Sequence, residues 1–309
     1  MPVVPTFLQS TVDPILKRLQ RTFLYYRRYR NSLNIRVNER YLKYARDCAA
    51  TYRVQHGAQN FPPSPLWTVG AQRLKEVMPQ EKATMYSSKI TQLIGSNDKN
   101  IVHPEKYRDL QVRILKPFTT LGADLLDIFR SPNLHNALLA YFKGNYRIEW
   151  ASAFRSLAAK ERLVDSWLWH IDSFPPYVCK IFFHLTPATV DTGVTDFMDH
   201  ADTLAYHRAG YHGQYGSERK ADLEEFAREH GLPYRPFHLD VEAGDATLFD
   251  VNCFHRGVAP RRAFRDVVQF LMVPNPIPWD EELKHDSFDR MDFDYGHDTF
   301  PKNPRRRGF

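Results

Sequence analysis

The chain has 309 residues, of which 43% are hydrophobic and 14% aromatic. A composition of this kind can bury a sizeable core and excludes a wholly disordered protein. Its three cysteines, Cys48, Cys179 and Cys253, do not have the number or spacing of a disulfide framework and fit a reducing compartment. No apolar run approaches the roughly 18 residues of a membrane span, and the N-terminal segment lacks the basic start and apolar centre of a signal peptide. We therefore expect a soluble, cytoplasmic protein.

Positive charge is concentrated near the N-terminus. Residues 17–46 contain ten Lys and Arg and one acid, a local charge of +9, whereas the whole chain carries +6, so the remainder carries −3. Apolar residues recur at intervals of three and four, which predicts that the arm over 14–46 is helical, with a second helix over about 38–55. The basic face has three open interpretations: a solvated helix surface, contact with an anionic membrane surface or lipid-like substrate, or nucleic-acid binding. The last is the least favoured, because no nucleic-acid reading module accompanies the arm.

The remaining elements follow in chain order. The sequence PPSP at 62–65 predicts a break, and 66–145 reads as further helices joined by loops. From Tyr146 onwards the pattern changes to period two, in short runs rich in aromatic and β-branched residues. These predicted strands are YRIEWASAF, DSWLWHI, YVCKIFFHLT, DATLFDV and RDVVQFLMV. One helix interrupts them over 217–231, with Ser217 as its cap and Gly231 at its end.

This order of elements predicts an α+β fold with a double-stranded β-helix, or jelly-roll (cupin-like), core. The expected division is a helical N-terminal region over 1–145, a jelly-roll core over 146–280 and a polar C-terminal tail over 281–309. The three parts are expected to form one structural domain.

One predicted strand carries a His-x-Asp pair, His170 and Asp172. Residues i and i+2 of a strand point the same way, so such a pair can deliver two metal ligands together. A mononuclear iron site needs two imidazoles and one carboxylate on one face of the metal, and His255 follows on a later strand as the third ligand. Ten residues further on, Arg265 opens another strand, where a guanidinium could pair with a carboxylate through two parallel hydrogen bonds. Two other His-x-Asp copies, at 200–202 and 238–240, do not fit this order of strands.

The ordered set resembles the iron(II)- and 2-oxoglutarate-dependent dioxygenases, specifically the phytanoyl-CoA dioxygenase-like family. The matching pieces are WHID at 169–172, IFFHLTPATVDTGVTDFM at 181–198, AGDATLFDVNCFHRGVAP at 243–260, and Arg265, which together span about 150–275. The resemblance implies that His170, Asp172 and His255 bind iron(II), that Arg265 binds the distal carboxylate of 2-oxoglutarate, and that O2 is the co-reactant. The segment DFMDHAD at 196–202 departs from the family pattern and leaves the substrate-side loop open.

Other basic side chains are weaker candidates. Arg155 and Lys180 could reach the second carboxylate of the cosubstrate or an acidic substrate, or could simply face solvent. Arg261 and Arg262 compete with Arg265 for the anchor role, but they are expected in the turn that precedes the strand.

The predicted function is hydroxylation, desaturation or cyclisation of a small organic substrate, coupled by resemblance to decarboxylation of 2-oxoglutarate to succinate. The presence of Asp172 favours these outcomes over halogenation, since related halogenases replace the acid with a small residue. Two alternatives stay open: the same chemistry on a macromolecular or membrane-associated substrate recruited by the basic arm, and a jelly-roll protein that binds a ligand without turnover.

Overall fold

The computed structural model describes residues 35–107, 109–158, 163–172, 174–213 and 216–284, and side chains from residue 41 onwards. Most of the basic arm over 14–46 and most of the C-terminal tail lie outside these residues, so the proposed anionic surface contact remains a prediction. Helix α2 (Ile35–His56) matches the helix expected over 38–55. Among the described helices, none is both long and apolar enough to cross a bilayer.

The core is a seven-stranded antiparallel sheet in the order β1-β8-β5-β10-β4-β3-β2. Its strands are β1 (Ala71–Leu74), β2 (Ile101–Val102), β3 (Gln111–Ile114), β4 (Tyr146–Ser156), β5 (Cys179–His184), β8 (Ala246–Asp250) and β10 (Arg265–Pro274). The central strands β4, β5, β8 and β10 fall where the aromatic and β-branched runs predict them.

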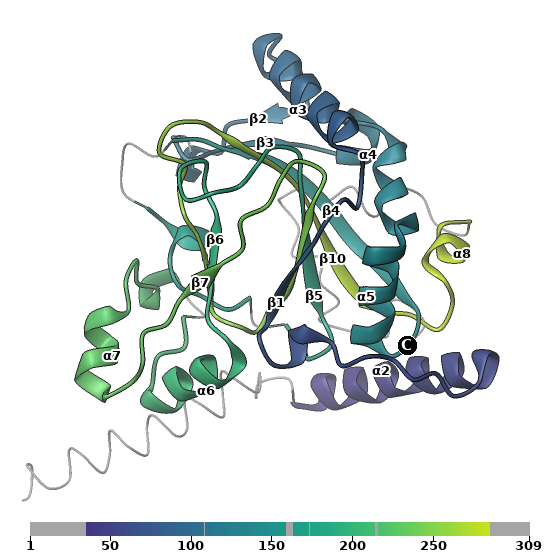
Figure 1. The fold of residues 1–309 in the computed structure, drawn as a ribbon. Helices are drawn as coiled ribbons and strands as arrows, with labels where there is room; N and C mark the ends of the chain where they lie inside the picture. The colour runs from purple at the N-terminus through teal and green to yellow at the C-terminus, as the bar shows by residue number, and fades with distance from the viewer. Residues whose placement is uncertain (1–34, 108, 159–162, 173, 214–215, 285–309) are drawn as a thin grey trace, which may run out of the picture.

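A second, three-stranded sheet has the order β7-β6-β9 and consists of β6 (Thr195–Phe197), β7 (Phe237–His238) and β9 (His255–Gly257). It packs on the large sheet through aromatic rings, since Phe197 lies 5.4 Å and His255 5.1 Å from Phe249 between ring centroids. Two antiparallel sheets packed in this way form the jelly-roll core that the sequence predicts (Figure 1).

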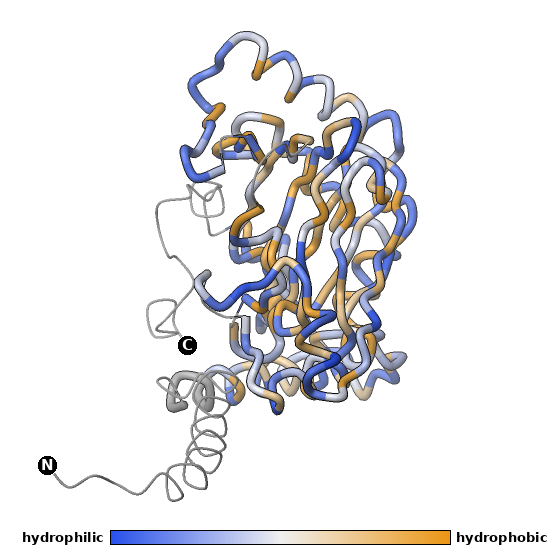
Figure 2. The backbone as a smooth tube through the Cα atoms, turned by 90° about the vertical axis from the view of Figure 1, so that its left-hand side faces the viewer, coloured by the Kyte–Doolittle hydropathy of each residue, from blue (hydrophilic) through white to orange (hydrophobic). Residues whose placement is uncertain are grey.

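Helices cover the opposite face of the large sheet (Figure 1). They are α3 (Gln80–Gly95), α4 (Pro117–Thr120), the 3₁₀ helix η4 (Ala123–Arg130), α5 (Pro132–Phe142) and α8 (Trp279–Lys284). Phe270 of β10 packs edge-on against Phe129 of η4, at 5.1 Å between ring centroids. Because side chains alternate along a strand, the neighbouring residues of β10 face the second sheet instead. Figure 2 shows hydrophobic residues along the packed strands and hydrophilic residues on the outer loops.

The structure differs from the sequence prediction in the N-terminal half. Strands β1, β2 and β3 lie within 66–145, where the sequence predicts only helices and loops. They have four, two and four residues, too few to show a period of two. Their strand character comes from pairing, of β1 with β8, of β3 with β4 and of β2 with β3.

The segment DSWLWHI is not a regular strand. It begins as the 3₁₀ helix η5 (Asp165–Trp167) and pairs with β9 only through one bridge, His170 with His255. The helix expected over 217–231 is also shorter than predicted. Ser217 lies in a separate 3₁₀ turn (Gly216–Glu218), and α7 spans Glu224–His230 before Gly231 in a left-handed conformation with φ 62°.

Helices α6 (His200–Ala209) and α7 enclose a small second core that contains a fully buried histidine, His207. Its Nδ1 lies 3.0 Å from the carbonyl oxygen of Tyr211, and its ring packs 4.8 Å from that of Phe254. Burial, reinforced by His212, lowers the pKa of His207 to about 3. His207 is therefore neutral in the folded protein over the whole range in which a free histidine titrates.

We expect His207 to make the fold sensitive to acid. Below a pH of about 6.5 the unfolded chain protonates this histidine and the folded chain does not, so stability falls as the pH falls from about 6.5 to about 3. Relative to His207→Gln, the wild type should lose about 1.4 kcal/mol of unfolding free energy per pH unit in that window. Urea unfolding of both proteins at pH 7.5 and 5.0 measures this. Equal losses in the two proteins would show that His207 does not contribute.

Candidate functional site

His170, Asp172 and His255 come together between the two sheets. One potential ligand atom from each lies within 4.8 Å of the others. The backbones of His170 and His255 exchange two hydrogen bonds, of 3.1 and 3.0 Å, and the amide of Asp172 donates to the carbonyl of Val251 at 3.0 Å. The bridge to β9 and the bond to the residue after β8 thus hold all three residues together, although 83 residues separate Asp172 from His255.

Each histidine has its second ring nitrogen on a backbone carbonyl. Nδ1 of His170 lies 2.7 Å from the oxygen of Leu168, and Nδ1 of His255 lies 2.9 Å from that of Cys253. A carbonyl can only accept, so Nδ1 carries the hydrogen in both rings and Nε2 keeps a lone pair. These two Nε2 atoms lie 3.9 and 3.5 Å from the carboxylate oxygens of Asp172. Both rings are thus oriented in the way that histidine ligands of metal sites usually are.

The protonation states suit a divalent cation. Burial, with a contribution from His255, lowers the pKa of His170 well below its usual range, so this ring is neutral at pH 7. Burial acts to raise the pKa of Asp172, but Lys180 and the two imidazoles outweigh it, and the carboxyl pKa lies well below its usual range. Two imidazoles and one carboxylate are the donor set of mononuclear non-haem iron(II) sites. The residues present therefore fit such a metal.

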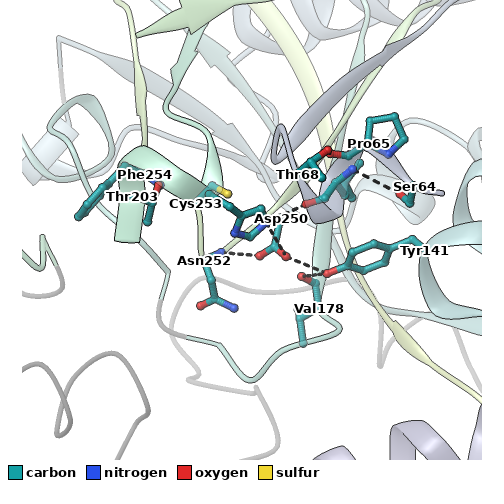
Figure 3. Close-up of polar contacts among 12 residues, drawn as sticks. Ser64, Pro65, Thr68, Tyr141, Val178, Thr203, Asp250, Asn252, Cys253 and Phe254 are labelled. Carbon is teal, nitrogen blue, oxygen red and sulfur yellow. Dashed lines mark hydrogen bonds and ion pairs between the residues drawn. The ribbon is translucent and has the colours of Figure 1, made fainter. Parts of the chain in front are cut away.

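The turn that carries His255 is held by the buried carboxylate of Asp250 (Figure 3). The amide of Asn252 donates to Asp250 Oδ1 at 2.8 Å, and the hydroxyl of Tyr141 donates to Oδ2 at 3.1 Å. Further along, the amide of Phe254 donates to the hydroxyl of Thr203 at 3.0 Å. These bonds fix the loop between β8 and β9 immediately before His255.

Arg265 lies in the same cavity as the two histidines and is 3% exposed. Its Nη1 donates to the carbonyl of Gly193 at 3.1 Å and faces the hydroxyl of Thr195 at 3.4 Å. Gly193 has φ 94°, and a Cβ there would lie 2.9 Å from the ring of Pro260, so only glycine fits this turn. Within the described part of the chain Arg265 forms no ion pair, and burial lowers its pKa to about 10. A buried guanidinium with only neutral acceptors is suited to an anionic ligand.

Lys180 of β5 also faces the cavity, as the sequence allowed. Its Nζ lies 2.7 Å from Oδ2 of Asp172, so it contacts a metal-ligand candidate directly and is 13% exposed. The ammonium neutralises the carboxylate in the absence of a metal.

Arg155 does not lie in the cavity. Its neighbours on β4, Phe154 and Ser156, line the cavity, so the alternation of side chains turns Arg155 to the other face. There it forms two hydrogen bonds of 2.7 Å with the carboxylate of Asp266 and one of 2.8 Å with Thr91 of α3. The expectation that Arg155 reaches a cosubstrate is wrong for this reason. Arg261 and Arg262 are exposed in the turn before β10.

The other His-x-Asp copies lie elsewhere. His200 contacts the carbonyl of Leu66 at 2.8 Å and Asp250 at 3.7 Å. His238 pairs with Asp196 and Asp240 on the small sheet.

The cavity between the sheets has a volume of about 150 Å³. Besides the residues already considered, its walls include side chains that the sequence did not single out: Tyr107, Gln111, Arg113, Phe154, Ser156, Ser166, Phe182, Thr195 and Gln269. Tyr107, Gln111 and Arg113 come from η3 (Glu105–Tyr107) and β3, which the sequence gives no signal for. The register of β3 against β4 and β10 could not be read from the sequence.

Comparison with known proteins is limited to solved structures. No protein-family model matches this sequence, and no curated protein matches it. The epimerase SnoN, described as a complex with Fe3+, alpha ketoglutarate and nogalamycin RO, aligns at 12% identity and a TM-score of 0.49 over 75% of this chain and 84% of its own. The alpha ketoglutarate dependent carbocyclase SnoK aligns at 14% identity and a TM-score of 0.42, over 71% of this chain and 87% of its own. AviO1 from Streptomyces viridochromogenes aligns at 16% identity and a TM-score of 0.45, over 69% of this chain and 93% of its own.

Proposed function

We propose that this protein is a non-haem iron(II)- and 2-oxoglutarate-dependent oxygenase that acts on a small organic substrate. The observation that carries the proposal is the position of Arg265, a buried guanidinium that pairs with no acidic side chain among the described residues, in the same cavity as His170 and His255. A metal triad alone would fit many metalloproteins. A metal triad together with a buried cation fits a cosubstrate with two separate anionic ends.

Each residue has a defined task in this proposal. The Nε2 atoms of His170 and His255 and one oxygen of Asp172 would hold iron(II). Arg265 would bind the distal carboxylate of 2-oxoglutarate through two hydrogen bonds, with Thr195 as an additional partner. Bound iron(II) would supply oxygen activation, and oxidation of 2-oxoglutarate to succinate and CO2 would balance that step. Because Arg265 is buried, water would be excluded from its ion pair with the 2-oxoglutarate carboxylate. The attraction between the two charges would therefore be stronger than at the surface.

The resemblance to the phytanoyl-CoA dioxygenase-like family supports the same assignment. Asp172 fills the coordination position that a chloride-transferring relative would leave open. We therefore propose hydroxylation, desaturation or cyclisation as the outcome. A protein that binds ligands without turnover is the competing account.

The first test is anaerobic addition of iron(II) and 2-oxoglutarate, followed by visible absorption spectroscopy. A charge-transfer band is expected for the wild type and for His238→Ala, which removes the histidine of another His-x-Asp pair. The band should be absent in His170→Ala, whose fold is checked by circular dichroism. Wild-type protein that neither retains iron(II) nor shows the band would contradict the oxygenase proposal and favour a binding protein.

A further inference from the structure

Two buried polar atoms at one end of the cavity have no hydrogen-bond partner among the described residues: Nε of Arg265 and Oγ of Ser156. Both residues line the cavity, and their exposed fractions are only 3% and 1%. Leaving a buried polar group unpaired costs free energy, so nearly all such groups in folded proteins have a partner. A ligand that binds between these two side chains would supply the partner for both.

The register of the large sheet places the two side chains next to each other. Arg265 of β10 and Ser156 of β4 are direct partners in the antiparallel pair. Side chains that are directly opposite in this way lie on the same face, with their Cβ atoms about 5 Å apart. The alternation that turns Arg155 to the opposite face therefore brings Ser156 to the cavity beside Arg265.

The contacts of Arg265 leave one edge of its guanidinium for a ligand. Its Nη1 donates to the carbonyl of Gly193 at 3.1 Å and faces the hydroxyl of Thr195 at 3.4 Å, on the small sheet. Nε, on the other edge, can only donate, and it does not donate to the hydroxyl of Ser156. A carboxylate oxygen has more than one lone pair, so a single oxygen can accept from Nε and from the serine hydroxyl together.

We propose that Ser156 is a further binding residue for the distal carboxylate of 2-oxoglutarate, and that its hydroxyl and Nε of Arg265 donate to the same carboxylate oxygen. The inference rests on the proposed oxygenase function, which assigns Arg265 to this carboxylate. It adds strand β4 to the elements that recognise the cosubstrate. Ser156 acts on affinity and position and takes no part in oxygen chemistry.

The test compares 2-oxoglutarate with 2-oxopentanoate, which has a methyl group in place of the distal carboxylate. Both are titrated calorimetrically into the full chain with iron(II) and without oxygen. Ser156→Ala should bind 2-oxoglutarate about tenfold more weakly than the wild type, as expected for loss of a hydrogen bond to a charged acceptor. The weak affinity for 2-oxopentanoate should be the same in both proteins. Ser156→Thr, which keeps the hydroxyl, should retain most of the affinity for 2-oxoglutarate, and the exposed control Ser88→Ala should bind like the wild type.

Thermal unfolding of the ligand-free proteins separates ligand binding from a structural role. Ser156→Ala removes no hydrogen bond between described residues, so its melting temperature should equal or exceed that of the wild type. Ser152 is the matched control, because it lies on the same strand and face and is equally buried. Its hydroxyl accepts from Nε2 of Gln269 at 2.6 Å, so Ser152→Ala should melt at a lower temperature.

Two results would overturn the role of Ser156. One is a Ser156→Ala variant that binds 2-oxoglutarate as tightly as the wild type, and the other is an equal loss of affinity for both acids. The proposed function fails in a different way, since the wild type would then not bind 2-oxoglutarate at all in the presence of iron(II). If the wild type binds it and Arg265→Leu does not, while Ser156→Ala matches the wild type, only the inference about Ser156 is wrong.

Discussion

Replacement of Arg265 by Leu is expected to weaken 2-oxoglutarate binding by about 100-fold or more without weakening the ligand-free fold. A bidentate pair between a buried guanidinium and a carboxylate contributes two charge-assisted hydrogen bonds, and loss of roughly 3 kcal/mol corresponds to that factor. Calorimetry on the wild type and Arg265→Leu, with iron(II) and no oxygen, measures the difference. Arg265→Lys, which keeps the charge but not the planar fork, should bind with intermediate affinity.

The stability of Arg265→Leu should change in the opposite direction to its affinity. The guanidinium of Arg265 is buried against neutral oxygens, and the lowering of its pKa to about 10 by burial reflects the cost of keeping it charged there. An apolar side chain removes that cost, so the ligand-free variant should melt at the wild-type temperature or slightly above it. Added 2-oxoglutarate should then raise the melting temperature of the wild type only.

Arg155→Leu is the matched control for this prediction. Arg155 lies in the same sheet and is also buried, but it pairs with Asp266 on the opposite face. Its loss leaves a buried carboxylate without a counter-charge and should cost about 3–5 kcal/mol of stability. If Arg265→Leu were destabilised as strongly as Arg155→Leu and still bound 2-oxoglutarate like the wild type, Arg265 would be a structural residue and not the anchor.

These two arginines also show what the sequence could and could not predict. The cluster of His170, Asp172 and His255 could be predicted because the order of the strong strands brings His255 back to His170. The expected strand at His170 and Asp172 is reduced to a single bridge, but the cluster still forms. The presence of Arg265 near the two histidines could be predicted from its place at the start of a strand. Arg155 could not be excluded from the cosubstrate site by sequence, because the orientation of its side chain depends on the register of β4 against β10. The same register identifies its partner, Asp266.

The part of the cavity built by the N-terminal half was not predictable for a different reason. Strand β3 has four residues, and the 3₁₀ turn that carries Tyr107 has three, so neither shows a period. Their conformation depends on pairing with β4, which is a tertiary interaction. Sequence reasoning therefore predicted the cluster of His170, Asp172 and His255 but not the part of the cavity wall that η3 and β3 supply.

Lys180→Met is expected to strengthen metal binding while weakening the metal-free fold. In the metal-free protein the ammonium of Lys180 lies 2.7 Å from Asp172 and is the nearest compensating charge among the described residues for that carboxylate. Its removal leaves the partly buried carboxylate of Asp172 without its nearest cation and should cost about 3 kcal/mol at neutral pH. The loss should shrink as the pH falls toward about 4, because Asp172 can then protonate.

A divalent cation supplies the charge that the variant lacks. In the wild type the metal must share Asp172 with an ammonium, and like charges a few ångströms apart repel. Without Lys180, cobalt(II) as a stand-in for iron(II) should bind about tenfold more tightly, and its binding should restore more stability than in the wild type. Titration calorimetry and thermal unfolding with and without cobalt(II) measure both effects. Lys43→Met removes the lysine of an exposed Lys–Asp pair on α2 and should change neither the affinity for cobalt(II) nor the stability that cobalt(II) restores. Weaker metal binding by Lys180→Met would instead mean that Lys180 holds Asp172 in the orientation the metal needs, and that its charge is secondary to this positioning.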